Sequence, residues 1–324
     1  MSTVLSAHKP NLSVATTGTI LPYDDDEAGT IVEPNGRPHW RYFMTDIDPE
    51  WCTIPLAVYC FMTGFIDCIS FSAIFVWCGF QTGNFAQLAL ALARLFETFS
   101  PTGSIHDTSF HIADRQALVS LLTFNLGALL GHIGDRVGSH TRLWLVLGTF
   151  TQALFTMAAA LTIWKSTQMD SSGKSIADDR GDPAWTNALS YVALGFMSAS
   201  MGLQGIMGKR LNTQFTTTGI ISSLLSQLLH YRFFPHSFIV LTTVWVELVT
   251  DPKLFYHQRV KTRDHKLIAA ISLFTGAFVS RAILAKTGAA GALGVACGVR
   301  LVVALGWVVV PGKSAKGGKG LLWE

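Results

Sequence analysis

Residues 54–78 read IPLAVYCFMTGFIDCISFSAIFVWC, a run of 25 residues with one charged side chain, Asp67. About 20 apolar residues in a helix are enough to cross the hydrocarbon core of a bilayer, which is about 30 Å thick. The run also lacks the alternation of apolar and polar residues that marks the strands of a transmembrane barrel. It therefore predicts a membrane-spanning helix.

Similar apolar runs continue along the chain. Residues 143–164 and 184–207 contain no charged residue. The composition agrees, because 14% of residues are charged, against about 25% in soluble proteins. Since every backbone polar group in lipid has to be satisfied internally, we expect an all-α, polytopic transmembrane helical bundle of about six to eight spans. Weaker candidate segments are 116–133, 211–229, 267–285, 287–311 and a short one at 83–96.

Both ends of the chain differ from this apolar middle. Residues 1–50 are rich in polar residues, include the acidic run DDDE at 24–27, and contain no apolar stretch that resembles the core of a signal peptide. Residues 312–324 combine three lysines with glycines. We interpret 1–50 as a disordered tail, 51–311 as the transmembrane domain and 312–324 as a flexible basic tail. Loops at 165–183 and 230–266 interrupt the apolar pattern.

The distribution of Lys and Arg predicts the orientation of the bundle. With eight spans, the loops on the side of the termini hold most of these residues, including Arg94, Arg115 and Lys165. The positive-inside rule then places both termini in the cytoplasm. The net charge of +3 reflects this asymmetry and does not indicate a nucleic-acid partner. The sequence identifies neither the membrane nor the oligomeric state. The side opposite the termini would hold Arg136, Arg142, Lys209, Arg210, Arg281 and Lys286.

The two halves of the chain share short matches in the same order, which predicts an internal duplication with halves at about 51–165 and 184–311. Membrane transporters are commonly built from such repeats, although a repeat can also be purely architectural. The shared small residues let helix backbones approach closely in lipid. The matches are QTGNFAQL at 81–88 with TTGIISSL at 217–224, Gly64-Phe65 with Gly195-Phe196, and Gly127 and Gly131 with Gly276 and Ser280.

Two blocks of sequence resemble a known family. GFID at 64–67, followed by Phe75-Val76 and QTGN at 81–84, resembles the YoaK-like family of membrane proteins, the domain of unknown function numbered 1275. MGLQ at 201–204 and TTTG at 216–219 resemble the second block of that family, and the resemblance covers roughly residues 50–311. The acidic N-terminal tail and the 230–266 loop resemble its fungal members. The resemblance implies a multi-span membrane protein and carries no established activity.

Asp67 is the most informative single residue. An aspartate at the centre of a span costs about 2.5 to 3.5 kcal/mol on insertion scales, unless it is paired, protonated or in contact with water. Arg300, near the middle of the last predicted span, is the cation at comparable depth, so we predict an Asp67–Arg300 pair. Asp67 could carry a proton or bind a cation. The alternative is a structural clamp, hydrogen-bonded to Ser70 or another neighbour.

The two Thr-Gly segments are a further candidate site. A helix that begins inside the membrane points free N–H groups and the positive end of its dipole at the midplane, where an anionic group is favoured. The alternative is that these residues cap short helices at the membrane surface. The predicted substrate-binding residues are Asp67, Gln81, Thr82, Gly83, Asn84, Gln204, Thr217, Thr218, Gly219 and Arg300.

The sequence offers little support for an enzyme. It contains no HExxH zinc pattern, no clustered histidines of the membrane di-iron kind, no P-loop and no GxSxG elbow. We therefore predict no catalytic residue, no metal site and no cofactor. The leading hypothesis is a secondary transporter or permease of a small solute, and the alternative is a non-transporting structural or regulatory membrane protein. The expected partners are the lipid bilayer and a small-molecule solute.

Overall fold

The computed structural model describes residues 39–94, 96, 109–166, 185–211, 248–252 and 260–313. Within these ranges the ordered elements are helices, and the extended contacts are isolated bridges, which confirms the predicted all-α class. The predicted segment 211–229 lies almost entirely outside the described residues. The helices are α1 His39–Phe43, the short 3-10 helix η1 Pro49–Trp51, α2 Thr53–Ile74, α3 Gln81–Arg94, α4 Ile112–Leu130, α5 His132–Val137, α6 Arg142–Lys165, α7 Ala188–Arg210 and α10 Lys261–Val309.

Five of the described helical stretches are long and apolar enough to cross a membrane: Thr53–Ile74, Ile112–Val137, Arg142–Lys165, Ala188–Arg210 and Arg263–Val309. The last contains 47 residues, about twice what one crossing needs. Gly288 interrupts it with φ 69° and ψ 179°, a backbone conformation that favours glycine. The chain belongs inside a bilayer over these stretches.

The two halves of α10 run in opposite directions. The first half is parallel to α2, because Phe61 lies against Gly276 and the Ser280 hydroxyl donates to the Phe65 carbonyl. The second half is antiparallel to α2, since its end lies beside the start of α2: Trp307 packs edge-on against Tyr59, and the Pro311 carbonyl accepts from the Asp48 N–H. The chain therefore reverses at Gly288, and the described helices α2, α4, α6, α7 and the two halves of α10 make six passes. This number lies within the predicted range.

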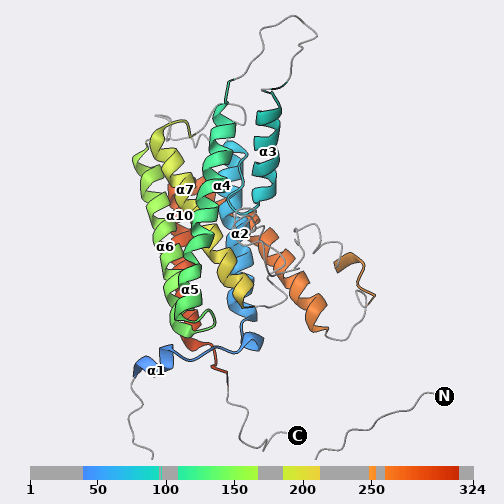
Figure 1. Cartoon of the computed structure of the whole chain (residues 1–324), viewed down its shortest axis with the longest axis vertical. Coiled ribbons are helices and arrows are strands. Elements are labelled where there is room, and N and C mark those ends of the chain that lie inside the picture. The colour runs from blue at the N-terminus through green and yellow to red at the C-terminus, as the bar shows by residue number, and fades with distance from the viewer. Residues whose placement is uncertain are drawn as a thin grey trace, which may run out of the picture. The chain divides into compact units, whose positions relative to one another are not determined.

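The remaining directions follow from contacts at the helix ends. Asn187, at the start of α7, donates to the Ser166 carbonyl at the end of α6, so these helices are antiparallel. α4 and α7 are parallel, because Gln116 donates to the Trp185 carbonyl at one end and Gly131 lies against Ile206 at the other. Figure 1 shows α4, α6 and α7 side by side, with α2 next to α7 and with α3 next to α4.

A close glycine contact joins α2 to the first half of α10. A Cβ added to Gly64 would overlap the carbonyl oxygen of Leu273, and a Cβ added to Gly276 would overlap that of Phe61. The backbones can therefore approach this closely only because both positions are glycine.

A second contact of the same kind joins α7 to α4. A Cβ added to Gly202 would overlap the carbonyl oxygen of Phe124, and a Cβ added to Gly127 would overlap that of Ala199. Each helix again contributes one glycine and one carbonyl, and each pair of helices is parallel. The two interfaces thus have the same construction.

Residues 44–52 pack against one end of the bundle, so the predicted tail boundary at residue 50 differs from the structure. Ile47 is 1% exposed, and its N–H donates to the His140 carbonyl. Lys313 donates its N–H to the Asp46 carbonyl, which also ties the start of the predicted C-terminal tail to this end. Cys52 is fully buried, and burial together with nearby Asp48 raises the pKa of its thiol to about 12. We name the end of the bundle that residues 44–52 and Lys313 contact the terminal end.

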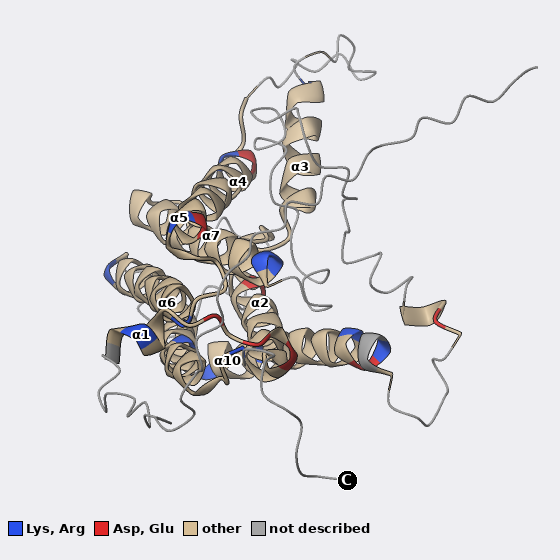
Figure 2. Cartoon of the chain, turned by 60° about the horizontal axis from the view of Figure 1, so that its bottom comes forward, with Lys and Arg blue, Asp and Glu red and all other residues tan. Residues whose placement is uncertain are grey.

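The structure corrects the predicted sides of several loops. Arg142 lies at the terminal end, because its guanidinium donates to the carbonyls of Tyr42 and Val310. Figure 2 shows shafts that are mostly tan, with most of the blue and red near the helix ends. The terminal end carries Arg41, Arg136, Arg142, Lys209, Arg210, Arg263, Lys266 and Lys313, whereas the opposite end carries Arg94, Arg115, Lys165, Arg281 and Lys286.

Candidate functional site

The helical path is broken between α2 and α3, inside the bundle. α2 ends at Ile74, and Phe75 takes a left-handed conformation with φ 57°. The chain then folds back along α2, because the N–H groups of Cys78 and Gly79 donate to Oδ1 of Asp67 at 2.8 and 2.7 Å. The start of α3 therefore lies near the level of Asp67, and we name residues 75–80 the α2–α3 break.

Asp67 is 2% exposed and has two different oxygen environments. Oδ1 accepts both N–H groups of the break, whereas Oδ2 is buried and has no hydrogen-bond partner among the described residues. A buried carboxylate oxygen without a partner costs free energy unless a proton, a cation or a donor reaches it. Oδ1 of Asp67 thus holds the α2–α3 break in place, whereas Oδ2 is available to a proton, a cation or a hydrogen-bond donor. The partners of Oδ1 are backbone groups of the break, whereas Ser70 donates to the carbonyl of Asp67.

Gln81 and Asn84 satisfy the carbonyl groups of the break. The Gln81 amide donates to the Cys78 carbonyl at 2.8 Å, and the Asn84 amide donates to the Trp77 carbonyl at 2.6 Å. Both amides also reach the Ser120 hydroxyl of α4 at 3.1 Å. In lipid such bonds are obligatory, because no water replaces the missing helical partners. These two predicted site residues therefore hold the break in place.

Gln204 of α7 lies beside the same face of α2. Its amide donates to the Tyr59 carbonyl at 2.8 Å and to the Thr63 hydroxyl at 3.0 Å. Thr63 precedes Asp67 by four residues, so it lies one helical turn away on the same face. Oε1 of Gln204 is buried and has no partner in the described part of the chain. Gln204 thus adds a second unpartnered acceptor near Asp67.

The predicted Asp67–Arg300 pair is wrong in this structure. Arg300 is 1% exposed, and its guanidinium donates to Oε1 of Gln152 at 2.6 Å and to the Met201 sulfur at 3.5 Å. The methyl carbon of Met201 lies 3.4 Å from the position that a Cβ on Gly79 would take. Met201 therefore lies between the break and Arg300. Similar depth along two helices did not bring the two charges into contact.

Two other predicted site residues, Thr82 and Gly83, do not join this group. Thr82 and Gly83 are exposed on α3, whereas Gln81 and Asn84 are buried. Thr217, Thr218 and Gly219 lie outside the described residues. The sequence reasoning missed the polar residues that complete the core: Thr63, Ser120, Thr149, Gln152 and Ser198. The signal for them was available, because each is a polar residue inside an apolar run.

Trp307 adds a buried donor to the same core. Its ring lies against Tyr59, and its Nε1 interacts with the Tyr59 hydroxyl without reaching the geometry of a full hydrogen bond. The Nε atom of Arg300 is buried and has no partner among the described residues. We name Asp67, Gln204, Arg300 and Trp307 the core polar set. It combines two acceptors and two donors, each with an atom that lacks a well-formed hydrogen bond among the described residues.

A bundle of six apolar passes around a broken helix defines a polytopic integral membrane protein. The chain belongs to the family described as protein of unknown function DUF1275, which matches residues 56–238 and 231–306. This confirms the resemblance seen in the two sequence blocks. No curated protein and no solved structure matches the chain.

Proposed function

We propose that this protein is a secondary transporter of a small solute, built as an inverted repeat. The observation that carries the proposal is the pair of matching glycine interfaces. The interval from Phe61 to Gly64 in α2 equals that from Ala199 to Gly202 in α7. In the partner helices, the interval from Leu273 to Gly276 of α10 likewise equals that from Phe124 to Gly127 of α4.

The two halves have opposite orientations in this proposal. α2 and α7 are antiparallel, since Gln204 near the end of α7 bonds to Tyr59 near the start of α2. Halves related in this way have a pseudo-twofold axis in the membrane plane, which is the architecture of many secondary transporters. The interfaces support the register that pairs Gly127 with Gly276. They pair Gly64 with Gly202, whereas the sequence match paired Gly64 with Gly195.

The core polar set supports a polar solute. Two acceptors, on Asp67 and Gln204, and two donors, on Arg300 and Trp307, lack a well-formed hydrogen bond in the described core. Unsatisfied polar groups in a low-dielectric interior bind complementary groups strongly. In this proposal Asp67 carries the coupling proton, and Met201, a flexible side chain between the break and Arg300, moves aside when the solute enters.

The terminal end faces the cytoplasm in this proposal. After the correction of the loop sides, it still carries more of the described Lys and Arg residues than the opposite end. The positive-inside rule therefore gives the same orientation as before, for a different set of loops.

Solute-driven proton movement in proteoliposomes tests the proposal. The protein is reconstituted with a trapped pH-sensitive dye and offered a panel of small polar solutes. We expect at least one solute to move protons, and Asp67→Asn to reduce the rate at least tenfold. Asp114→Asn is the matched control, because Asp114 is a buried carboxylate of α4 that pairs with Arg94 outside the core polar set.

One result would oppose transport itself, and another would oppose the coupling role of Asp67. If the wild-type protein shows neither proton movement nor a thermal shift with any solute, it is a structural or regulatory membrane protein. If uptake occurs and Asp67→Asn leaves it unchanged, Asp67 is a clamp for the α2–α3 break and has no coupling role.

A further inference from the structure

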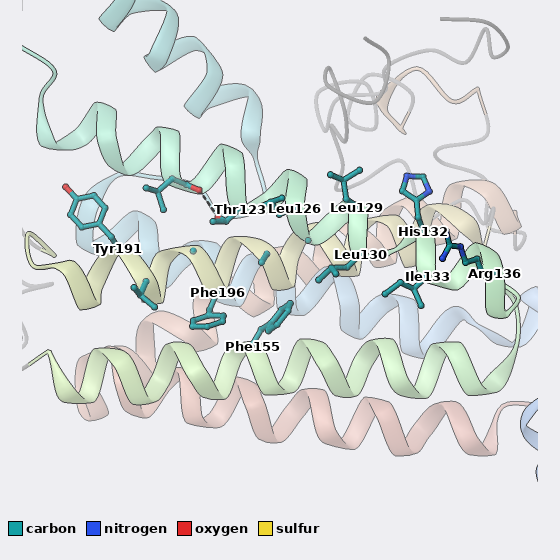
Figure 3. A pocket seen from close by; sticks show the side chains of 15 residues that line it. Thr123, Leu126, Leu129, Leu130, His132, Ile133, Arg136, Phe155, Tyr191 and Phe196 are labelled. Carbon is teal, nitrogen blue, oxygen red and sulfur yellow. Dashed lines mark hydrogen bonds between the residues drawn. The ribbon is translucent and has the colours of Figure 1, made fainter. Parts of the chain in front are cut away.

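An apolar groove runs along the outer surface of the bundle between α4, α6 and α7. It has a volume of about 820 Å³. Figure 3 shows Tyr191 at one end, Thr123, Phe155 and Phe196 along its length, and His132 with Arg136 at the other end. α4 lines it from residue 119 to residue 130. At about 1.5 Å per residue this distance is close to half of the ~30 Å hydrocarbon core.

The end of the groove near Arg136 carries an unbalanced positive charge. Asp135 is the acidic residue beside it, and that carboxylate already contacts Arg210 at 2.6 Å and His132 at 3.1 Å. Arg136 is exposed and has no ion pair or hydrogen bond with the described residues. The apolar groove, about one leaflet long, thus ends at a cation that has no partner among the described residues.

We propose that this groove binds an anionic phospholipid, with one acyl chain along α4 and α7 and the phosphate at Arg136. The chemistry of the groove fits both parts of such a lipid. A cation near the surface attracts anionic headgroups, at about 1 kcal/mol for each Lys or Arg. A second copy of the chain could also cover the apolar walls, and the variants below distinguish that occupant from a lipid. The site is separate from the core polar set and does not depend on transport.

Native mass spectrometry of the purified full-length protein tests the site, with phosphatidylglycerol and phosphatidylcholine of identical acyl chains as probes. We expect phosphatidylglycerol to bind about fivefold more tightly. Arg136→Gln should remove this preference while some binding of both lipids remains. Arg41→Gln is the matched control, because Arg41 is an exposed cation of the same end that does not line the groove.

A second pair of variants tests the acyl chain position. Val192→Phe should weaken both lipids, because Val192 lines the groove and is 46% exposed. Leu122→Phe, at an exposed position of α4 outside the groove, should leave binding unchanged. Glycerol phosphate, which lacks acyl chains, should not compete at the lipid concentrations used.

The proposal would be overturned by equal binding of the two lipids, by no effect of Arg136→Gln, or by competition from glycerol phosphate. A dimer that Val192→Phe dissociates without a change in lipid binding would also overturn it, in favour of a contact between copies.

Discussion

Asp67 shows how a carboxylate can be held inside an apolar bundle without an ion pair. Two backbone N–H groups donate to Oδ1, and these hydrogen bonds stabilise the carboxylate in the way that a cation would otherwise do. Those N–H groups are free because the chain leaves the helix at Phe75 and folds back. The carboxylate and the break therefore require each other: the break supplies donors, and the carboxylate satisfies backbone groups that lipid cannot.

Gly79→Ala tests this mutual dependence. A Cβ at Gly79 would lie 2.9 Å from Oδ2 of Asp67 and 3.3 Å from Thr63, and overpacking of this kind costs about 1 to 3 kcal/mol. We expect Gly79→Ala to lower the midpoint of thermal unfolding in detergent relative to the wild-type protein. Tryptophan fluorescence measures this midpoint. Gly306→Ala is the control, because a Cβ there meets nothing within 4 Å and should leave stability unchanged or slightly raise it. An unaltered midpoint for Gly79→Ala would contradict the tight packing of the break against Asp67.

The contact between Arg300 and Gln152 makes a second prediction. Gln152→Leu leaves the buried guanidinium without its oxygen acceptor, so we expect a loss of about 1 to 3 kcal/mol or more. The double variant Gln152→Leu with Arg300→Met removes both polar groups, and it should be more stable than Gln152→Leu alone. Thermal unfolding of both single variants and of the double variant gives the coupling energy. Additive losses would show that the two side chains do not stabilise each other.

At the scale of elements, hydropathy predicted most of the helices because the length of an apolar run is set by the membrane. The run 143–164 became α6 almost residue for residue, and the run 184–207 became α7 with its ends displaced by three or four residues. The division at residue 286 appears as the reversal at Gly288. The fold-back of residues 75–80 was not predictable, since it depends on hydrogen bonds to Asp67 and Ser120 from distant positions. The Asp67–Arg300 pair failed for a related reason: depth along a helix says nothing about which face a residue occupies.

The proposed duplication makes a prediction about helix interfaces. Gly64→Ala and Gly202→Ala should each destabilise the bundle, and by similar amounts, because each added Cβ overlaps a backbone carbonyl oxygen that cannot move independently. Gly195→Ala should cost less, since its Cβ would lie 3.2 Å from the Cγ2 methyl group of Thr123, whereas the other two would lie 2.0 Å from a carbonyl oxygen. Gly294→Ala, with nothing within 4 Å, is the control.

Unfolding midpoints of these four variants would decide the register of the repeat. A loss for Gly64→Ala that is matched by Gly195→Ala and not by Gly202→Ala would favour the register read from the sequence. Losses that match between Gly64→Ala and Gly202→Ala favour the structural one.

At the scale of the whole molecule, one short helix explains why the predicted loop sides differ from the structure. Counting residues 83–96 as a crossing segment moved the loops near Arg136 and Arg142 to the side opposite the termini. α3 has 14 residues, about 21 Å of helix, and it begins near the level of Asp67 in the bundle interior. It therefore ends at the same side as α2, so the loops from the end of α3 to the end of α7 change sides, whereas Arg281 and Lys286 keep their predicted side.

Cysteine labelling distinguishes the two arrangements. In a variant whose five cysteines are replaced by serine, single cysteines are introduced by Arg136→Cys, Lys165→Cys or Lys313→Cys, all at exposed positions. Arg136→Cys and Lys313→Cys should react with a membrane-impermeant maleimide from one face, and Lys165→Cys from the other, because the first two lie at the terminal end. The eight-span arrangement requires Lys165→Cys and Lys313→Cys to react together instead. If the terminal end is cytoplasmic, intact cells label only Lys165→Cys, whereas detergent exposes all three. Retained thermal stability of the cysteine-free variant is the control that its fold is unchanged.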